Sequence, residues 1–433
     1  MMKKLLHKIA VKTRLIYLWR VAKNVKNKGL KKTAKYFSYK VSTISPVLKL
    51  RQKRLDNQLN EILEANNDKP IILSLSFIDW DVPLYQRPQH VAIQLAKQGF
   101  LYFYHTRNYY DFLDGYKKIG ENMYLTNRFD DVYEKLKGKK KFIHLYSTNM
   151  YEDDEARIER ALDNGDMILY EYIDEISEKI SGRKIPQFVL DRHERLLKDE
   201  EHCYVIATAD KLYKDVAKHR RKNFKLVTNG VVYEHFRDIE NMIPKEMEGV
   251  VSKNKPIIGY YGALASWFDY ELLKGVARER EDWSFVLIGW DYDGSFKKSG
   301  LDGLRNVFVV PPVDYHRLPL YAQWFDVCMI PFQINDVTKS TSPVKLFEYM
   351  ALGKPIVTTP MPECKKYKSV IIANNDTRDF MKKVEEGLRK REDGKYLELL
   401  KEEALENTWE KKAEEIREVI SKVIYYLRDS SIS

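Results

Sequence analysis

Short runs of β-branched and other apolar residues alternate with amphipathic or charged stretches along the chain from residue 67 onward. Five such runs in the first half of this region are 70–76, 100–105, 141–146, 167–172 and 204–208. Runs of this length are typical of strands buried on both faces of a parallel sheet. Segment 87–99 has Pro88 near its start and Gly99 at its end, which predicts a helix between the first two strands. The pattern predicts a β-α-β-α domain over residues 67–245.

The same pattern restarts after a charged linker at 241–254 and predicts a second domain over residues 253–398. Its apolar runs are 255–262, 283–289, 306–310, 325–330 and 355–359, with helices expected at 267–278 and 343–352. Residues 399–433 form a long, charged amphipathic helix or helix pair, expected to pack back on the first domain. The predicted fold class is α/β, with two Rossmann-like doubly wound domains facing a cleft.

The N-terminus differs from the rest of the chain in its charge. Residues 1–66 are expected to form a basic helical extension. Residues 1–54 hold 17 of the 74 Lys and Arg side chains and no Asp or Glu, while the remainder carries 57 basic and 63 acidic side chains. An anionic surface is therefore the expected partner. We favour the inner face of the plasma membrane, at which each basic residue contributes about 1 kcal/mol. Nucleic acid offers the same electrostatics, and a solvated arm packed on its own protein is the third possibility.

The apolar runs and the cysteines exclude several classes of protein. No run of about 18 apolar residues is long enough to span a bilayer, and no signal peptide is recognisable. The three cysteines, Cys203, Cys328 and Cys364, are widely spaced and have no neighbouring His pairs, so neither disulfides nor a zinc site is expected. These features favour a cytoplasmic protein without a metal site.

The segment 338–355 carries the clearest candidate chemistry. Ser342 and Pro343 are expected at the N-cap and first position of a helix that Gly353 ends. Free N–H groups and the positive end of the helix dipole form an anion site there. Lys339 and Lys345 could neutralise a diphosphate, and Glu348 could accept hydrogen bonds from ribose hydroxyls. An ordinary capped helix with solvated lysines is the alternative.

The sequence of this segment resembles that of the donor site of GT-B glycosyltransferases, especially the family 4 group that builds bacterial surface polysaccharides such as teichuronic acid. The matching residues are Ser342-Pro343-x-Lys345-x-x-Glu348-Tyr349-x-Ala351-x-Gly353-Lys354-Pro355. Further similar pieces follow in the family's order: Arg87-Pro88-Gln89-His90, Val227-Thr228-Asn229-Gly230-Val231, and Gly259 to Gly262 with Trp267-Phe268-Asp269. Two departures are Ser340, where the family often has a Glu, and the apolar stretch 262–265, where it often has a cation.

The resemblance implies roles for individual residues. Donor-binding residues would be Gly262, Val313, Lys339, Ser342, Pro343, Val344, Lys345 and Glu348, with the nucleobase near 311–313. Catalytic candidates are Asp79, His144 and Asp174, and acceptor-side candidates are Asp81, Arg87 and His90. For Asp79 the alternative is a strand-end turn, and for His144 it is a buried, fully hydrogen-bonded histidine.

The function implied is a glycosyltransferase that moves a sugar from a UDP- or GDP-linked donor to a glycan or lipid-linked acceptor. No cofactor and no metal are expected, because Lys345 and the helix terminus would stabilise the leaving diphosphate. The family generally retains anomeric configuration. Two alternatives stay open, namely a sugar-nucleotide epimerase of the same architecture and a non-catalytic membrane- or nucleic-acid-binding protein.

Overall fold

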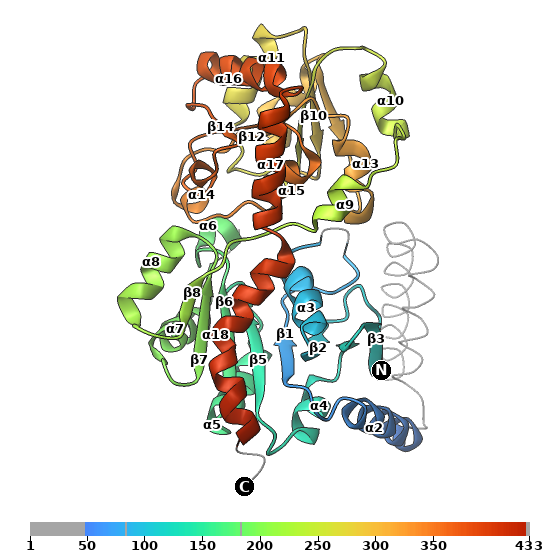
Figure 1. Ribbon diagram of the computed structural model, residues 1–433, viewed down its shortest axis with the longest axis vertical. Helices are drawn as coiled ribbons and strands as arrows, with labels where there is room; N and C mark the ends of the chain where they lie inside the picture. Colours follow the sequence, from blue (N-terminus) through green and yellow to red (C-terminus); the bar gives the residue numbers. More distant parts are fainter. Residues whose placement is uncertain (1–47, 83–84, 182–183, 430–433) are drawn as a thin grey trace, which may run out of the picture.

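Two sheets, each flanked by helices, make up the computed structural model, which describes residues 48–82, 85–181 and 184–429 (Figure 1). The first sheet has eight strands in the order β3-β4-β2-β1-β5-β6-β7-β8, and the second has six in the order β11-β10-β9-β12-β13-β14. Every neighbouring pair is parallel except β3–β4. The predicted fold class is confirmed. The basic stretch 1–47 lies outside the described residues.

The N-terminal sheet contains the five predicted strands and three that the sequence pattern did not predict, β3, β4 and β8. The strands are β1 (Ile71–Leu75), β2 (Leu101–His105), β3 (Tyr116–Gly120), β4 (Met123–Thr126), β5 (Lys141–Tyr146), β6 (Met167–Tyr172), β7 (Cys203–Ala207) and β8 (Phe224–Leu226). The helices are α2 (Leu48–Glu64), α3 (Arg87–Lys97), α4 (Phe129–Lys135), α5 (Asp153–Asp163), α6 (Glu178–Ser181), α7 (Gln187–Lys198) and α8 (Asp210–His219).

Alternate residues of each strand enter separate cores on the two faces of this sheet. Ile71, Leu73 and Leu75 pack with α2, α4, α5 and α7, whereas Ile72 packs with α3 and the C-terminal helix α18 (Trp409–Asp429). Both faces are therefore covered, which explains why the strands appear in the sequence as continuous apolar runs.

The C-terminal sheet is wound in the same way around one large core. Its strands are β9 (Ile257–Tyr261), β10 (Ser284–Ile288), β11 (Val307–Val310), β12 (Val327–Ile330), β13 (Ile356–Thr358) and β14 (Val370–Ile372). The connecting elements are α9 (Tyr233–Arg237), α10 (Lys245–Val251), α11 (Tyr270–Glu279), α12 (Ser295–Ser299), η1 (Leu301–Gly303), η2 (Tyr315–Arg317), α13 (Leu318–Ala322), α14 (Asp336–Lys339), α15 (Val344–Leu352), η3 (Cys364–Lys366), α16 (Thr377–Lys390) and α17 (Gly394–Glu406).

The last two helices return the chain from the second domain to the first. Helix α17 packs on α15, and α18 packs on α3 (Figure 1). Between them, the Val231 amide donates to the Asn407 carbonyl (3.0 Å), and the Trp409 amide donates to the Val231 carbonyl (3.0 Å). Backbone bonds thus join the end of α17 to the earlier connection between the domains.

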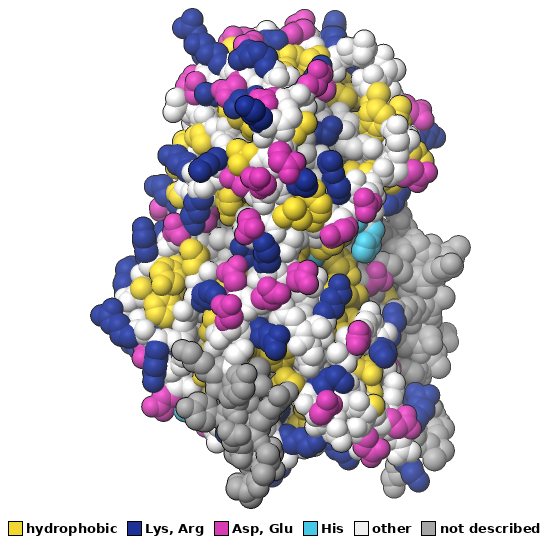
Figure 2. Space-filling view, in the orientation of Figure 1, with side chains coloured by type: hydrophobic (Ala, Val, Ile, Leu, Met, Phe, Trp, Pro, Cys, Tyr) yellow, Lys and Arg dark blue, Asp and Glu magenta, His cyan; other side chains and the backbone are white. Residues whose placement is uncertain are grey.

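Helix α2 anchors the end of the N-terminal extension to the first domain. Leu55, Leu59 and Ile62 are buried in its core, and Arg51 forms an ion pair with Asp114. Basic and acidic side chains are interspersed over the face in Figure 2, in keeping with the near balance of charge after residue 54. Within the described residues, none of the helices has the length and apolar character needed to span a bilayer.

Candidate functional site

A cavity of about 330 Å³ lies between the two domains, at the ends of β6, β9 and β10. Ligands of doubly wound folds bind at this carboxyl edge of the strands. Of the predicted site residues, those that line the cavity are Arg87, Asp174, Gly262, Val313, Ser342, Pro343, Val344, Lys345 and Glu348. The structure does not bring Asp79, Asp81, His90, His144 or Lys339 into this lining.

Helix α15 begins one residue later than the sequence suggests. Pro343 occupies the N-cap position with extended backbone (φ −71°, ψ 118°) and provides no side-chain cap. The prediction of Ser342 as N-cap is wrong, because Asn229 of the other domain engages it instead. The Asn229 side-chain amide donates to the Ser342 carbonyl (2.6 Å), and the Asn229 backbone N–H donates to Ser342 Oγ (3.3 Å). The first-turn amides of α15 therefore start at the cavity wall without a side-chain cap.

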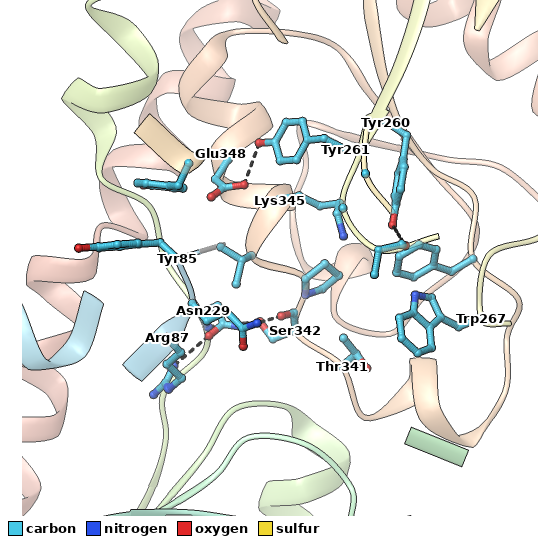
Figure 3. Close-up of a pocket in the computed structure, with 18 of the residues that line it drawn as sticks. Tyr85, Arg87, Asn229, Tyr260, Tyr261, Trp267, Thr341, Ser342, Lys345 and Glu348 are labelled. Carbon is cyan, nitrogen blue, oxygen red and sulfur yellow. Dashed lines mark hydrogen bonds between the residues drawn. The ribbon is translucent and has the colours of Figure 1, made fainter. Parts of the chain in front are cut away.

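Lys345, in the first turn of α15, reaches into the cavity (Figure 3). Its Nζ lies 5.0 Å from the centre of the Tyr260 ring and 5.2 Å from that of Phe332. Among the described residues, no side-chain oxygen forms a hydrogen bond or ion pair with this amine. Burial lowers the pKa of Lys345 to about 8, although the nearby Glu348 carboxylate opposes the shift. A cation held without a carboxylate partner is suited to an anionic ligand.

Glu348 follows Lys345 by one helical turn and is buried against the Tyr261 side chain. The Tyr261 hydroxyl donates to Glu348 Oε2 (2.8 Å), so one carboxylate oxygen is fixed and the other is left for a ligand (Figure 3). Burial raises the pKa of Glu348 to about 7, against the opposing effects of the Tyr261 hydrogen bond and Lys345. The spacing places Lys345 and Glu348 on one face of the helix, as a diphosphate next to a ribose requires.

The pKa directions of these two groups give a pH dependence for ligand binding. Protonation of Glu348 below about pH 7 removes the acceptor, and deprotonation of Lys345 above about pH 8 removes the cation. We expect affinity for a nucleotide sugar to be highest between these values and to fall on both sides. A nucleotide sugar is the correct probe because its diphosphate does not titrate in this range. Calorimetry of Glu348→Gln should show the acidic limb lost and the alkaline limb kept, and a flat wild-type profile would contradict the assignment.

Two glycines let the ends of β9 and β10 approach each other and Lys345. Gly262 has φ +134°, and a Cβ built there would lie 3.1 Å from Lys345 Nζ. Gly289 has φ +155°, and its Cβ would lie 1.9 Å from the Gly262 carbonyl oxygen. Neither position has room for a side chain. Backbone atoms therefore form the surface next to the Lys345 amine.

Arg87 lines the cavity, but its guanidinium is held by the protein. It forms a buried ion pair with Glu171 and donates to the Thr228 carbonyl (2.9 Å) and to Asn229 Oδ1 (3.2 Å). Because Asn229 in turn binds Ser342, Arg87 supports the contact between the domains beside α15. These bonds give Arg87 a positioning role between the domains, and its acceptor-side role stays a prediction.

The surroundings of His144 do not support its prediction as a catalytic residue. It is fully buried, with Nδ1 2.8 Å from the Tyr102 hydroxyl and Nε2 2.8 Å from Glu171 Oε1. The alternative, a buried histidine with both nitrogens bonded, is what the structure shows.

Asp79 is the second correction, since its carboxylate organises a turn after β1. It accepts from Thr106 Oγ1 (2.9 Å), the Asn108 amide (3.1 Å) and the Tyr110 amide (2.6 Å). Asp81 belongs to the same turn, its amide donating to Asp111 (2.7 Å). These bonds favour the strand-end alternative over catalysis for Asp79.

His90 and Lys339 also lie outside the cavity. His90 is buried and stacks on Trp409 (4.9 Å between ring centres, 8° between planes), and burial lowers its pKa to about 3. It is therefore neutral and part of the core beneath α18. Lys339 ends α14 and is exposed, so it does not flank α15 as predicted.

Asp174 remains as the candidate from the first domain. It follows β6 and faces the cavity, and burial raises its pKa to about 7. Among the described residues that line the cavity, Asp174 and Glu348 are the only carboxylates.

Sequence reasoning did not assign roles to Tyr261 and Asn229, which hold Glu348 and Ser342. Tyr261 sits within a strand and carries no local signal. Asn229 lies in the Thr-Asn-Gly turn after β8, where a polar side chain next to glycine was a usable hint.

Residues 255–390 match the family model described as glycosyl transferases group 1. TuaH of Bacillus subtilis (strain 168), named as a glycosyltransferase of teichuronic acid biosynthesis, is 27% identical over 262 residues. That alignment covers 56% of this chain and 64% of the relative, so less than two thirds of the relative is spanned.

Two solved structures have a fold similar to that of this chain. Sucrose-phosphate synthase from Thermosynechococcus elongatus superimposes with a TM-score of 0.63 at 13% identity, over 83% of this chain and 100% of that chain. Alr3699/HepE of Anabaena, solved in complex with UDP, gives a TM-score of 0.56 at 13% identity, over 82% of this chain and 100% of that chain.

Proposed function

We propose that this protein transfers a sugar from a UDP- or GDP-linked donor to a glycan or lipid-linked acceptor of the cell envelope. The observation that carries the proposal is the face of α15, where uncapped amides, Lys345 and Glu348 open together into the interdomain cavity. The diphosphate would bind Lys345 and the helix amides, and the ribose would bind Glu348. The UDP complex of Alr3699/HepE and the teichuronic acid assignment of TuaH support the donor class and the acceptor class.

The reaction would need no metal. As the acceptor hydroxyl bonds to the anomeric carbon, the bond from that carbon to the diphosphate oxygen breaks, and negative charge develops on the leaving group, which takes up the hydroxyl proton. Lys345 and the helix terminus are fixed beside that charge before the reaction begins, which is the arrangement that lowers a barrier electrostatically. Asp174 approaches from the other domain and would orient the acceptor hydroxyl. We expect retention of anomeric configuration, as in the family 4 group, and proton NMR of the product would test it.

A donor panel tests the proposal against its alternatives. Incubation with UDP- and GDP-sugars, followed by mass spectrometry and NMR, should show slow donor hydrolysis alone and transfer when envelope glycans or lipid-linked sugars are added. Isomerised donor without transfer would instead identify an epimerase, which the glycosyltransferase family match does not favour. Failure to bind any nucleotide would contradict both enzyme assignments.

We further propose that the basic N-terminal stretch holds the enzyme on the cytoplasmic face of the membrane. The test should delete residues 1–47 and keep α2, because Arg51 and Leu55 anchor that helix to the first domain. The full chain should co-sediment with anionic vesicles at low salt and be released at high salt, whereas the deletion variant should stay in the supernatant. Neutral vesicles are the control. Equal co-sedimentation of both proteins with anionic vesicles would contradict the proposal.

A further inference from the structure

An aromatic pair, Trp267 and Tyr292, stands at the edge of the interdomain cavity. Trp267 lines the cavity and is half-buried, while Tyr292 is 49% exposed and lies next to it, with ring centres 5.8 Å apart. The roles assigned so far to α15 and Asp174 leave this pair unused. A large apolar side chain left partly open to water beside a cavity favours contact with a ligand.

The loops that carry the pair are held firmly. The Trp267 carbonyl accepts from the Gln333 amide (2.8 Å), and the adjacent Phe268 is fully buried. On the other loop the Tyr292 amide donates to the Leu264 carbonyl (2.8 Å), and the Leu264 amide donates to the Trp290 carbonyl (3.0 Å). Trp267 is thus presented on a fixed backbone, which lowers the entropy cost of binding.

The position of Trp267 indicates which part of a donor it would meet. In Figure 3, Glu348 and Trp267 lie on opposite sides of Lys345, and Thr341 lies on the Trp267 side. If the ribose binds Glu348 and the diphosphate binds Lys345, the glycosyl group must extend toward Trp267. This step rests on the proposed function.

The first domain also contacts the segment that precedes α15. Ser340 Oγ lies 3.1 Å from Glu175 Oε2, and Lys211 Nζ donates to the Asp336 carbonyl (3.3 Å). These contacts bring the segment after β6, with Asp174, against the residues that precede α15.

Much of the cavity lining is apolar. It includes Ala263, Ile180, Val337 and Phe332, and the Thr341 hydroxyl on the Trp267 side is already donating to the Val337 carbonyl (2.8 Å). Among the described residues that line the cavity, Lys345 is the one cation not paired with a carboxylate, and the diphosphate would engage it. Asp174 adds a carboxyl group that is charged above about pH 7. An acidic sugar would therefore be desolvated next to a carboxylate with no cation to balance it.

We propose that the Trp267 indole, next to Tyr292, is the platform for the apolar face of the donor's glycosyl group, and that the site takes neutral sugars. The C–H face of a pyranose lies flat on an aromatic ring, and a methyl or acetamido group adds apolar contact. N-acetylhexosamines and 6-deoxyhexoses are therefore favoured over uronic acids.

Calorimetry with nucleotide and nucleotide-sugar pairs tests this proposal. The probes are UDP, UDP-N-acetylglucosamine and UDP-glucuronic acid, or GDP, GDP-fucose and GDP-mannuronic acid if the chain selects guanine. Trp267→Ala should weaken binding of the neutral nucleotide sugar by about 3- to 10-fold, the strength of an aromatic contact, and leave the nucleoside diphosphate unaffected. Trp267→Phe should keep most of the affinity. Wild type should bind the neutral sugar nucleotide more tightly than the acidic one.

The matched control is Trp324→Ala, which removes a half-buried tryptophan of the same domain away from the cavity lining. It should change neither affinity. Equal weakening of nucleoside diphosphate and nucleotide sugar in Trp267→Ala would show that Trp267 holds the nucleotide, and would overturn the proposal while keeping the glycosyltransferase assignment. Unchanged affinities, or tighter binding of the acidic sugar by wild type, would also overturn it. Absence of binding to every probe would instead overturn the proposed function on which it rests.

Discussion

Replacing Lys345 by alanine is expected to lower turnover by about 10²- to 10³-fold, the usual effect of removing one preorganised donor from a developing negative charge. The amine stands over the Gly262 turn and is the unpaired cation of the described cavity lining. No neighbouring side chain can take its place at the diphosphate, because the Arg87 guanidinium is already bonded to Glu171. Steady-state kinetics and calorimetry with the donor should both show the loss.

Lys339→Ala is the matched control, since Lys339 is exposed, lies outside the cavity and comes from the same segment. It should leave turnover near the wild-type value. Lys345→Met should not lower the thermal stability of the free protein, because burial lowers the pKa of Lys345 and so folding disfavours its charged form. Wild-type turnover in Lys345→Ala would remove the central residue from the proposed site.

Glu171→Gln is expected to destabilise the N-terminal domain by about 3–5 kcal/mol, the cost of leaving a buried charge without its partner. Glu171 is fully buried and holds Arg87 on one oxygen and His144 on the other. The amide keeps the shape but leaves the guanidinium uncompensated. Urea denaturation should show the loss in the transition of the N-terminal domain. Glu159→Gln is the control, because that carboxylate pairs with Arg195 at the surface and should cost less than about 1 kcal/mol.

The same residue gives a pH dependence of stability. Burial alone would raise the pKa of Glu171, but Arg87 and His144 outweigh it and hold the pKa below its ordinary value. The carboxylate therefore stabilises the folded state above its unfolded pKa, and this contribution is lost as the pH falls through the folded value. Acid should reduce the stability difference between wild type and Glu171→Gln. A difference that grows on acidification would contradict the assignment.

Local runs of apolar residues were sufficient to predict most of the fold. The strands that were predicted are buried on both faces, so their apolar runs stand out, and all five runs of the first domain became strands. Three of the four missed strands have weaker patterns. In β3 three of the five residues are exposed, and β8 and β14 have three residues each. Such strands form because a neighbouring strand is already in place.

The candidate site likewise contains residues that local sequence could predict and residues that it could not. Lys345, Glu348 and Gly353 were predictable because one helix fixes their spacing, and Gly353 does adopt the left-handed conformation expected of it (φ 67°). His144 could not be judged locally, because Glu171, 27 residues later, decides its environment. Ser342 has the right residue type for a cap, yet Asn229, 113 residues earlier, binds it instead. Contacts between residues distant in sequence therefore account for the errors.

The paired crossings of the chain at Val231 and Thr408 have a mechanical consequence. The two crossings lie side by side and are joined by backbone hydrogen bonds, so they form a single hinge axis. Gly230 allows this approach, since a Cβ there would lie 2.7 Å from the Asn407 carbonyl oxygen. Sliding of one domain past the other would break these bonds, whereas rotation about the axis would keep them. Opening of the cavity therefore has one low-cost direction, in which the Ser340–Glu175 and Asp210–Glu363 hydrogen bonds between the domains would separate.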